Sequence, residues 1–160
     1  MRVGLGGAVT VTATERWLAE IRSGRAFTRG GFSGPTAATL SHLQLFNPAA
    51  SGVTIIIRAV IVAVSATGLV AIVTHNTALT TLVGAGVNLL AGGAAGLGEL
   101  RSLDNAVQLG TIADRLSLIA DTPSDVVPEW FFELGAGEGI LVNSENANVR
   151  TIATYHWIEL

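Results

Sequence analysis

The residues of this chain that could do chemistry are few and scattered. Three histidines could act as general bases or metal ligands, namely His42, His75 and His156. None of them lies three or four residues from another ligand in a helical pattern, the spacing that builds many metal sites. The alternation of neighbouring residues places His42 and His156 on strands among core residues, and His75 in a turn. We therefore expect no metal site from these side chains.

Two short segments resemble ligand loops. Asp121, Asp125 and Glu129 follow one another at a spacing of four, but two prolines in the same DTPSDVVPE segment prevent a shared helix face. Calcium coordination there stays an alternative, although the segment lacks the denser Asp/Asn pattern of calcium loops. The GAGEG segment, Gly135 to Gly139, has no Lys-Ser/Thr after it and precedes a strand pattern. It therefore predicts a tight β-turn between strands and not a phosphate loop.

Nucleophilic chemistry has no motif in this sequence. There is no Gly-x-Ser-x-Gly elbow, and the chain contains no cysteine, so disulfides and thiolate metal sites are ruled out. We expect a protein that is not an enzyme and that carries no cofactor.

The composition indicates association with other chains. Hydrophobic residues make up 49% of the 160 residues and charged residues only 13%, which is little charge for the surface of a free monomer. The length fits one domain. We therefore expect part of the apolar surface to be covered by neighbouring subunits.

The charge is divided unevenly along the chain. All nine basic residues are arginine, and the first thirty residues hold five of them against two glutamates, a net charge of +3. The rest holds four arginines against ten acids, a net charge of −6, which together give −3. This asymmetry is typical of an interaction arm on an acidic domain. The alternative, that these arginines only keep a flexible tail in solution, stays open.

The N-terminal region predicts one short helix followed by a linker. In TERWLAEIR, residues 14–22, Thr14 can cap a helix that carries Trp17, Leu18 and Ile21 on one side. The next segment, RAFTRGGFSGP, is basic and Gly-rich and is expected to be extended. We therefore divide the chain into an N-terminal arm, residues 1–35, and a β-sandwich domain, residues 36–160.

The segment NPAASGVTIIIRAVIVAVSATG, residues 47–68, predicts a long strand. Its apolar run is long enough to suggest a membrane helix, but Arg58 interrupts it, β-branched residues dominate it and turn pairs flank it. Strict alternation places Arg58 on the same face as Val60, Val62 and Val64. Because both faces are apolar, we expect one to pack on a second sheet and the other on a neighbouring subunit or on the arm.

The remainder reads as short strands between turns, so the fold class is mainly β, an antiparallel β-sandwich. Leu69–Thr74 is expected to pair back on the long strand across the turn at Ala66–Gly68. The six glycines within residues 79–98 predict an irregular connection. The further predicted strands are Leu116–Ala120, Val126–Leu134, Ile140–Val142 and Val149–Glu159.

Three segments resemble small structural proteins of tailed bacteriophages. They are LFNPAASGVTIIIRAVIVAVSATG at Leu45–Gly68, GGAAGLGELR at Gly92–Arg101, and ELGAGEGILV followed by the terminal YHWIEL. The resemblance covers about the last two-thirds of the chain and rests on turn and strand signals. It implies a jelly-roll-like β-sandwich that assembles as an oligomer on the virion, and it says nothing about the N-terminal arm.

Together these observations predict a capsid decoration or cement protein on the virion surface that forms a trimer and binds the major capsid protein. The arm would supply the contacts, since arginine and aromatic residues dominate interface energetics. The expected partner-binding residues are Arg16, Trp17, Arg22, Arg25, Phe27, Arg29 and Phe32. No membrane partner is expected, and protein contact is favoured over nucleic acid because the basic residues cluster in the arm.

Two alternatives stay open. A tail, adaptor or fibre-base protein would use the same sandwich elsewhere on the particle. A carbohydrate-binding or receptor-binding module would need exposed aromatic residues near acids. The candidates for that site are Trp130, Phe131 and Phe132 beside Glu129 and Glu133.

Overall fold

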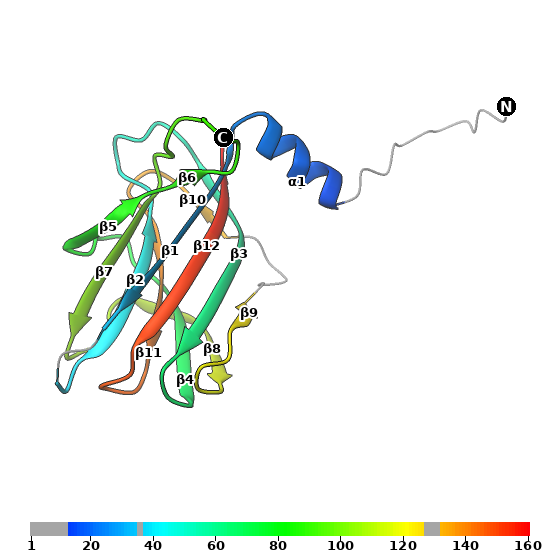
Figure 1. Ribbon diagram of the computed structural model, residues 1–160. Helices are drawn as coiled ribbons and strands as arrows, with labels where there is room; N and C mark the ends of the chain where they lie inside the picture. The colour runs from blue at the N-terminus through cyan, green and yellow to red at the C-terminus, as the bar shows by residue number, and fades with distance from the viewer. Residues whose placement is uncertain (1–12, 35–36, 127–131) are drawn as a thin grey trace, which may run out of the picture.

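The computed structural model describes residues 13–34, 37–126 and 132–160 and forms two antiparallel sheets packed face to face, with one helix at the N-terminal end (Figure 1). The helix, α1 (Ala13–Arg22), matches the predicted helix within one residue. Gly24, at a φ of 72°, follows it and lets the chain turn into the first strand.

Each sheet has six strands. Sheet A contains, in spatial order, β10 (Glu133–Leu134), β3 (Ile55–Val64), β12 (Thr151–Glu159), β1 (Ala26–Ser33) and β6 (Val87–Asn88), while β9 (Ser124–Val126) also pairs with β3. Sheet B contains β5 (Thr81–Ala85), β7 (Glu99–Asn105), β2 (Leu40–Phe46), β11 (Gly139–Ser144), β4 (Gly68–Thr74) and β8 (Thr111–Leu118). The chain passes repeatedly from one sheet to the other, so the predicted jelly-roll-like β-sandwich is confirmed.

The core lies between the two sheets and is anchored by aromatic residues of β12. Tyr155 and Trp157 are fully buried. The Tyr155 hydroxyl donates a hydrogen bond of 2.8 Å to the Leu43 carbonyl of β2, which ties the sheets together. Burial without a charge partner raises the pKa of Tyr155 far above its usual range, so this hydroxyl remains a donor.

The segment after the helix is a strand inside sheet A and not a linker. β1 pairs along its whole length with β12, from Ala26 opposite Ile158 to Ser33 opposite Thr151, and on its other side with β6. The predicted arm boundary at residue 35 is therefore wrong, because residues 26–33 belong to the sandwich. Among the described residues of the arm, α1, the short turn after it and Gly34 lie outside the sheets.

The long predicted strand is confirmed as β3. The residues that face the core are odd-numbered before Arg58 and even-numbered after it. Ile57 pairs with Trp157 and Ala59 with His156, so Arg58 is an extra residue, a β-bulge. Ile57 and Val60 both face the core across this bulge. The prediction that Arg58 shares a face with Val60 is therefore wrong, since Arg58 lines hollows on the outer side of the sheet.

Two predicted hairpins are instead crossings between the sheets. β4 was expected to pair with β3, but it lies in sheet B between β11 and β8. The GAGEG turn closes with the Glu138 amide donating to the Gly135 carbonyl, yet it joins β10 of sheet A to β11 of sheet B. The predicted irregular segment, residues 79–98, contains β5 and β6.

Candidate assembly surface

The outer face of sheet A carries apolar side chains in register across three strands. Phe32 of β1 lies opposite Ile152 of β12, which in turn lies opposite Ala63 of β3. The next outward row is Gly30, Thr154 and Ile61. Phe32 is 64% exposed and Ile152 44% exposed, and Figure 1 shows the three strands side by side. This surface, called here the outer face of sheet A, is the first candidate site.

The outer face of sheet B, in contrast, is partly covered by loops of the same chain. Gln44 is fully buried there. Its side-chain amide donates to the carbonyls of His75 and Thr77, and its oxygen accepts from the Leu79 amide. A small second apolar cluster lies on the same side, made of Ala71, Val73 and Leu141 with Leu109 and Ile112. The loops after β4 and β7 thus cover the middle of this face, while Leu69 of β4 and Leu82 of β5 stay 46% and 53% exposed.

Arg150 provides the main charge beside the exposed pair on sheet A. Its guanidinium lies over the Phe32 ring, 5.9 Å from the ring centroid, in a cation–π contact. The backbone amide of Arg150 donates to the Ser65 hydroxyl at 3.0 Å, which fixes the end of β12 beside β3. The exposed aromatic ring is therefore held in place by a neighbouring strand.

A groove lies at the end of this face away from α1, and we call it the distal groove. Its floor is formed by Ile61, Ala63, Ile152 and Thr154, and Asp121 lies at its rim. The Asp121 amide donates to the Val64 carbonyl at 2.8 Å, which fixes the acid beside β3. The groove encloses about 390 Å³ and combines an apolar floor with an exposed carboxylate.

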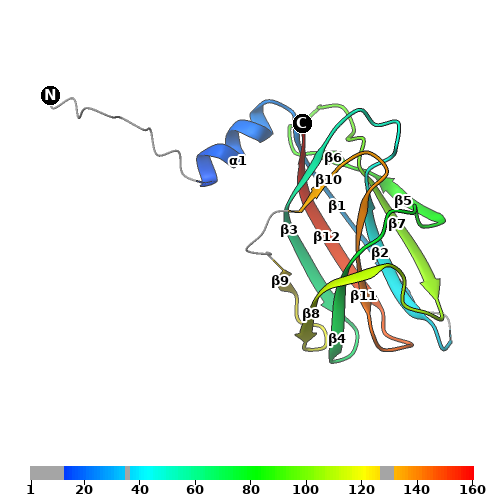
Figure 2. The same cartoon turned by 180° about the vertical axis from the view of Figure 1, so that it is seen from behind.

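The helix α1 projects from the opposite end of the sandwich, beside the chain's C-terminus (Figures 1 and 2). Trp17 lines two hollows that it shares with Arg58, one with His156 and Ile61 and the other with Ile158. Leu18 on the helix is 42% exposed. The helix therefore touches the near end of the outer face of sheet A and leaves the distal groove uncovered.

The structure divides the seven predicted partner-binding residues into two groups. Arg16, Arg22 and Arg25 are exposed and Trp17 is half-buried, all on α1 or just after it, and Arg25 pairs with Glu20 at 2.9 Å. Phe32 belongs to the outer face of sheet A.

Two of the seven are structural, so their prediction as free anchors is wrong. Phe27 is 5% exposed and stacks on Trp157 with 6.1 Å between ring centroids. Arg29 points inward and donates to the Val83 carbonyl at 3.1 Å. Its guanidinium lies so close over Gly84 that a Cβ at this position would collide with it.

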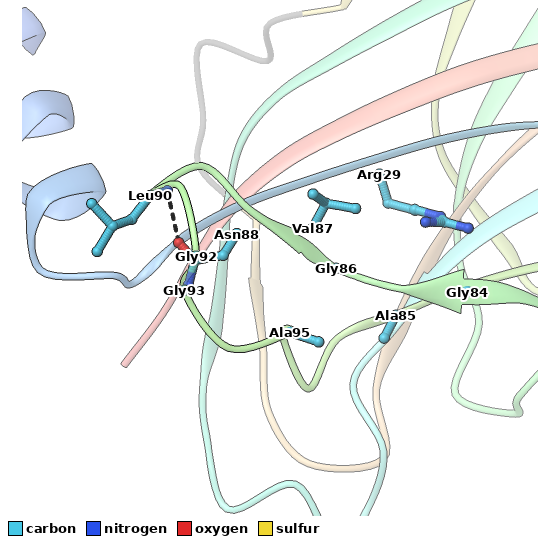
Figure 3. A pocket seen from close by; sticks show the side chains of 10 residues that line it. All are labelled: Arg29, Gly84, Ala85, Gly86, Val87, Asn88, Leu90, Gly92, Gly93 and Ala95. Atoms are coloured by element: carbon cyan, nitrogen blue, oxygen red, sulfur yellow. Dashed lines mark hydrogen bonds between the residues drawn. The ribbon is translucent and has the colours of Figure 1, made fainter.

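A second groove lies at the Gly-rich edge of the sandwich (Figure 3). Arg29, Val87, Asn88 and Leu90 line it together with glycines and alanines. The Asn88 amide donates to the Gly24 and Ala94 carbonyls and its oxygen accepts from the Leu90 amide, so its polar atoms already hold the loop. With no acid or histidine in its lining, this groove offers no acid–base chemistry.

The histidines lie where the sequence predicts them. His42 is buried on β2, His156 is half-buried on β12 between Tyr155 and Trp157, and His75 follows β4. Burial lowers the pKa of all three. Within the described ranges, no group of three or more His, Asp or Glu side chains is placed to hold a metal ion.

The remaining sequence candidates are only partly described. Glu129, Trp130 and Phe131, from the carbohydrate and calcium hypotheses, lie outside the described residues. Phe132 packs against the core and Glu133 is exposed on β10. Among the helices of the described part, none is long and apolar enough to cross a membrane.

Sequence reasoning missed the residues that make the outer face of sheet A, above all Ile152, Thr154 and Ile61. A signal for the first two was present, since Ile152, Thr154 and His156 alternate with Ala153, Tyr155 and Trp157. The sequence pattern does not reveal that β1 pairs with β12, and this pairing is what places Phe32 opposite Ile152.

Comparisons with protein-family models, curated proteins and solved structures found no match to this chain. The resemblance to phage structural proteins therefore rests on the sequence motifs alone. The outer face of sheet A is the structural feature that bears on function.

Proposed function

We propose that this chain is a non-enzymatic structural protein of a tailed-phage virion, a capsid decoration or cement protein that trimerises and binds the major capsid protein. The observation that carries the proposal is the exposed cross-strand pair Phe32 and Ile152, beside Ala63 and Ile61, on the outer face of sheet A. Exposed apolar surface that is contiguous over several strands marks an interaction site.

The contrast between the two sheets supports this reading. The chain uses two loops to cover the middle of the outer face of sheet B, where Gln44 is buried under them. On the outer face of sheet A, within the described part of the chain, Trp17 of α1 borders one end and Asp121 and Pro123 border the other, while Phe32 and Ile152 stay exposed. A second subunit is the natural cover for such a face, because burying side chains like Phe32 and Ile152 contributes roughly 1.5–3 kcal/mol each.

The helix supplies the candidate contacts with the major capsid protein. Arg16 is exposed on α1 at the edge of the hollow that it lines with Trp17, and it can reach carboxylates of a capsid protein. In this proposal the outer face of sheet A forms the contact between subunits, and Arg16 attaches the trimer to the head.

The test is the copy number of this chain in purified particles, measured by quantitative mass spectrometry against the major capsid protein. A decoration protein is expected in several hundred copies, because it repeats over the symmetric head lattice. A count of about a dozen or fewer would instead place the chain in the tail or an adaptor ring. Absence from the particle would contradict both.

A further inference from the structure

The distal groove begins where the hollows lined by the helix of the same chain end. Trp17 lines a hollow with Arg58, His156 and Ile61, whereas the groove extends from Ile61 and Thr154 to Ser65 and Arg150. No residue of α1 is part of the groove lining. Among the residues that the structure describes, no segment of the same chain fills the groove.

The helix presents a ridge that its own sandwich does not use. Leu18 is 42% exposed, and Arg22 follows it one turn later on the same side and is also exposed. Trp17, on the adjoining side, lines the hollows shared with Arg58. One side of the helix thus lies against its own sheet. A second side, which carries Leu18 and Arg22, faces outward.

The distal groove has the complementary features. Its floor contains Ile61, Ala63 and Ile152, and Asp121 is exposed at its rim. Among the residues that the structure describes, no basic side chain forms an ion pair with Asp121. Arg150 lines the groove as well, but its guanidinium is engaged with the Phe32 ring.

We propose that α1 of one subunit docks in the distal groove of the next, with Leu18 on the apolar floor and Arg22 paired with Asp121. The inference rests on the proposed trimer and names the contact that forms it. Because helix and groove are different surfaces, the contact is heterologous, the type of contact from which a three-membered ring is built when the rotation between subunits closes. A face-to-face contact between two copies of sheet A would leave Leu18 and Arg22 without a partner.

Cysteine cross-linking tests this contact directly, since the chain contains no cysteine of its own. Leu18→Cys and Ile152→Cys variants of the full chain are mixed, oxidised and analysed by gel. We expect disulfide-linked dimers that hold one copy of each variant, and a cross-linked species of three chains from the double variant. Leu18→Cys mixed with Val107→Cys is the matched control, because Val107 is 59% exposed on the loop after β7 of sheet B.

The outcomes separate this inference from the proposed function. Cross-linking of Ile152→Cys with itself would show face-to-face packing and overturn the helix contact. A trimer by native mass without any Leu18–Ile152 cross-link would overturn the inference and leave the proposed trimer standing. A single-chain mass would overturn both.

A charge exchange provides a second, independent measurement. Arg22→Asp and Asp121→Arg are each expected to raise the trimer dissociation constant roughly threefold to tenfold, and the double exchange to recover most of that loss. Arg115→Asp, on β8 of sheet B, controls for the change in net charge. If the loss of trimer affinity in the double variant equals the sum of the losses in the two single variants, Arg22 does not pair with Asp121.

Discussion

Phe32 and Ile152 lie directly opposite each other on the paired strands β1 and β12, with both side chains on the outer face of sheet A. Cross-strand pairs of aromatic and β-branched residues stabilise a sheet, but here most of the ring stays in contact with solvent. The same two strands bury Phe27 and Trp157 on the other face. Sheet A therefore carries apolar side chains on both sides, and we propose that a second subunit covers those on the outer side.

Replacing Ile152 with threonine should weaken the trimer and leave the fold intact. Threonine keeps the β-branched shape that suits a strand but removes apolar surface from the proposed interface. We expect the dissociation constant to rise roughly tenfold, measured by analytical ultracentrifugation. Val107→Thr is the control and should have no effect, since Val107 lies on the side of sheet B. Equal effects of the two variants would argue against an interface at Ile152.

Phe27→Ala should unfold the sandwich, because Phe27 is a core residue and not an arm anchor. Its ring is buried and stacks on Trp157, so its loss leaves a cavity. The free energy of unfolding should fall by about 3–5 kcal/mol in urea titrations. Phe32→Ala, with the exposed ring, should lower it by less than about 1 kcal/mol. If both variants lowered the free energy of unfolding by similar amounts, Phe27 would not be a core residue.

Glu159→Gln should loosen the Gly-rich loop. The Glu159 carboxylate accepts hydrogen bonds from the Leu97 and Gly98 amides and from the Trp157 indole, at 2.8 to 3.1 Å. A glutamine amide presents a donor where acceptors are needed, so we expect a loss of about 1–3 kcal/mol of unfolding free energy. Glu145→Gln, which breaks an exposed ion pair with Arg115, is the control and should cost under about 1 kcal/mol. Faster hydrogen exchange of the Gly98 amide in Glu159→Gln than in the natural chain would show that the loss of stability arises in the Gly-rich loop.

Stability should decrease as the pH falls below about 6.5, the ordinary pKa of histidine. Burial lowers the pKa of His42, with His75 acting in the same direction, while Asp104 and the backbone contacts with Leu103 and Leu40 oppose it. In the window between the lowered native pKa and the ordinary value, the unfolded chain binds the proton and the native chain does not. The free energy of unfolding therefore drops as the pH is lowered, by at most about 1.4 kcal/mol per pH unit from this group.

Urea titrations at pH 7 and pH 5 measure this pH dependence. His42→Asn should show a smaller difference between the two pH values than the natural chain. A residual difference is expected, because burial also lowers the pKa of His75 and His156. If His42→Asn keeps the full difference, His42 is protonated in the folded state or contributes nothing.

Much of the fold could be predicted from local patterns. The β-branched run at 55–64, the alternation around Tyr155 and Trp157 and the short helix with Trp17 each carry a strong periodic signal. The strand at residues 26–33 does not, since Gly30 and Gly31 lower its β-propensity. Those glycines are explained by tertiary contacts, because a Cβ at Gly31 would meet Leu100 at 2.8 Å.

The parts that could not be predicted depend on partners distant in sequence. The bulge at Arg58 is defined by the register against β12, almost a hundred residues later. The three residues of the turn after Val64 likewise do not reveal whether the chain returns to the same sheet or crosses to the other one. The candidate surface combines β1, β3 and β12, so only the assembled sheet places Phe32, Ile152 and Ala63 together.

The native mass of the purified chain tests the central claim most directly. At micromolar concentration we predict a particle of three times the 16.5 kDa of one chain, which shifts toward single chains in the Ile152→Thr variant. A mass of one chain over the whole concentration range, with Ile152→Thr indistinguishable from the natural chain, would contradict the claim that the outer face of sheet A is a subunit interface.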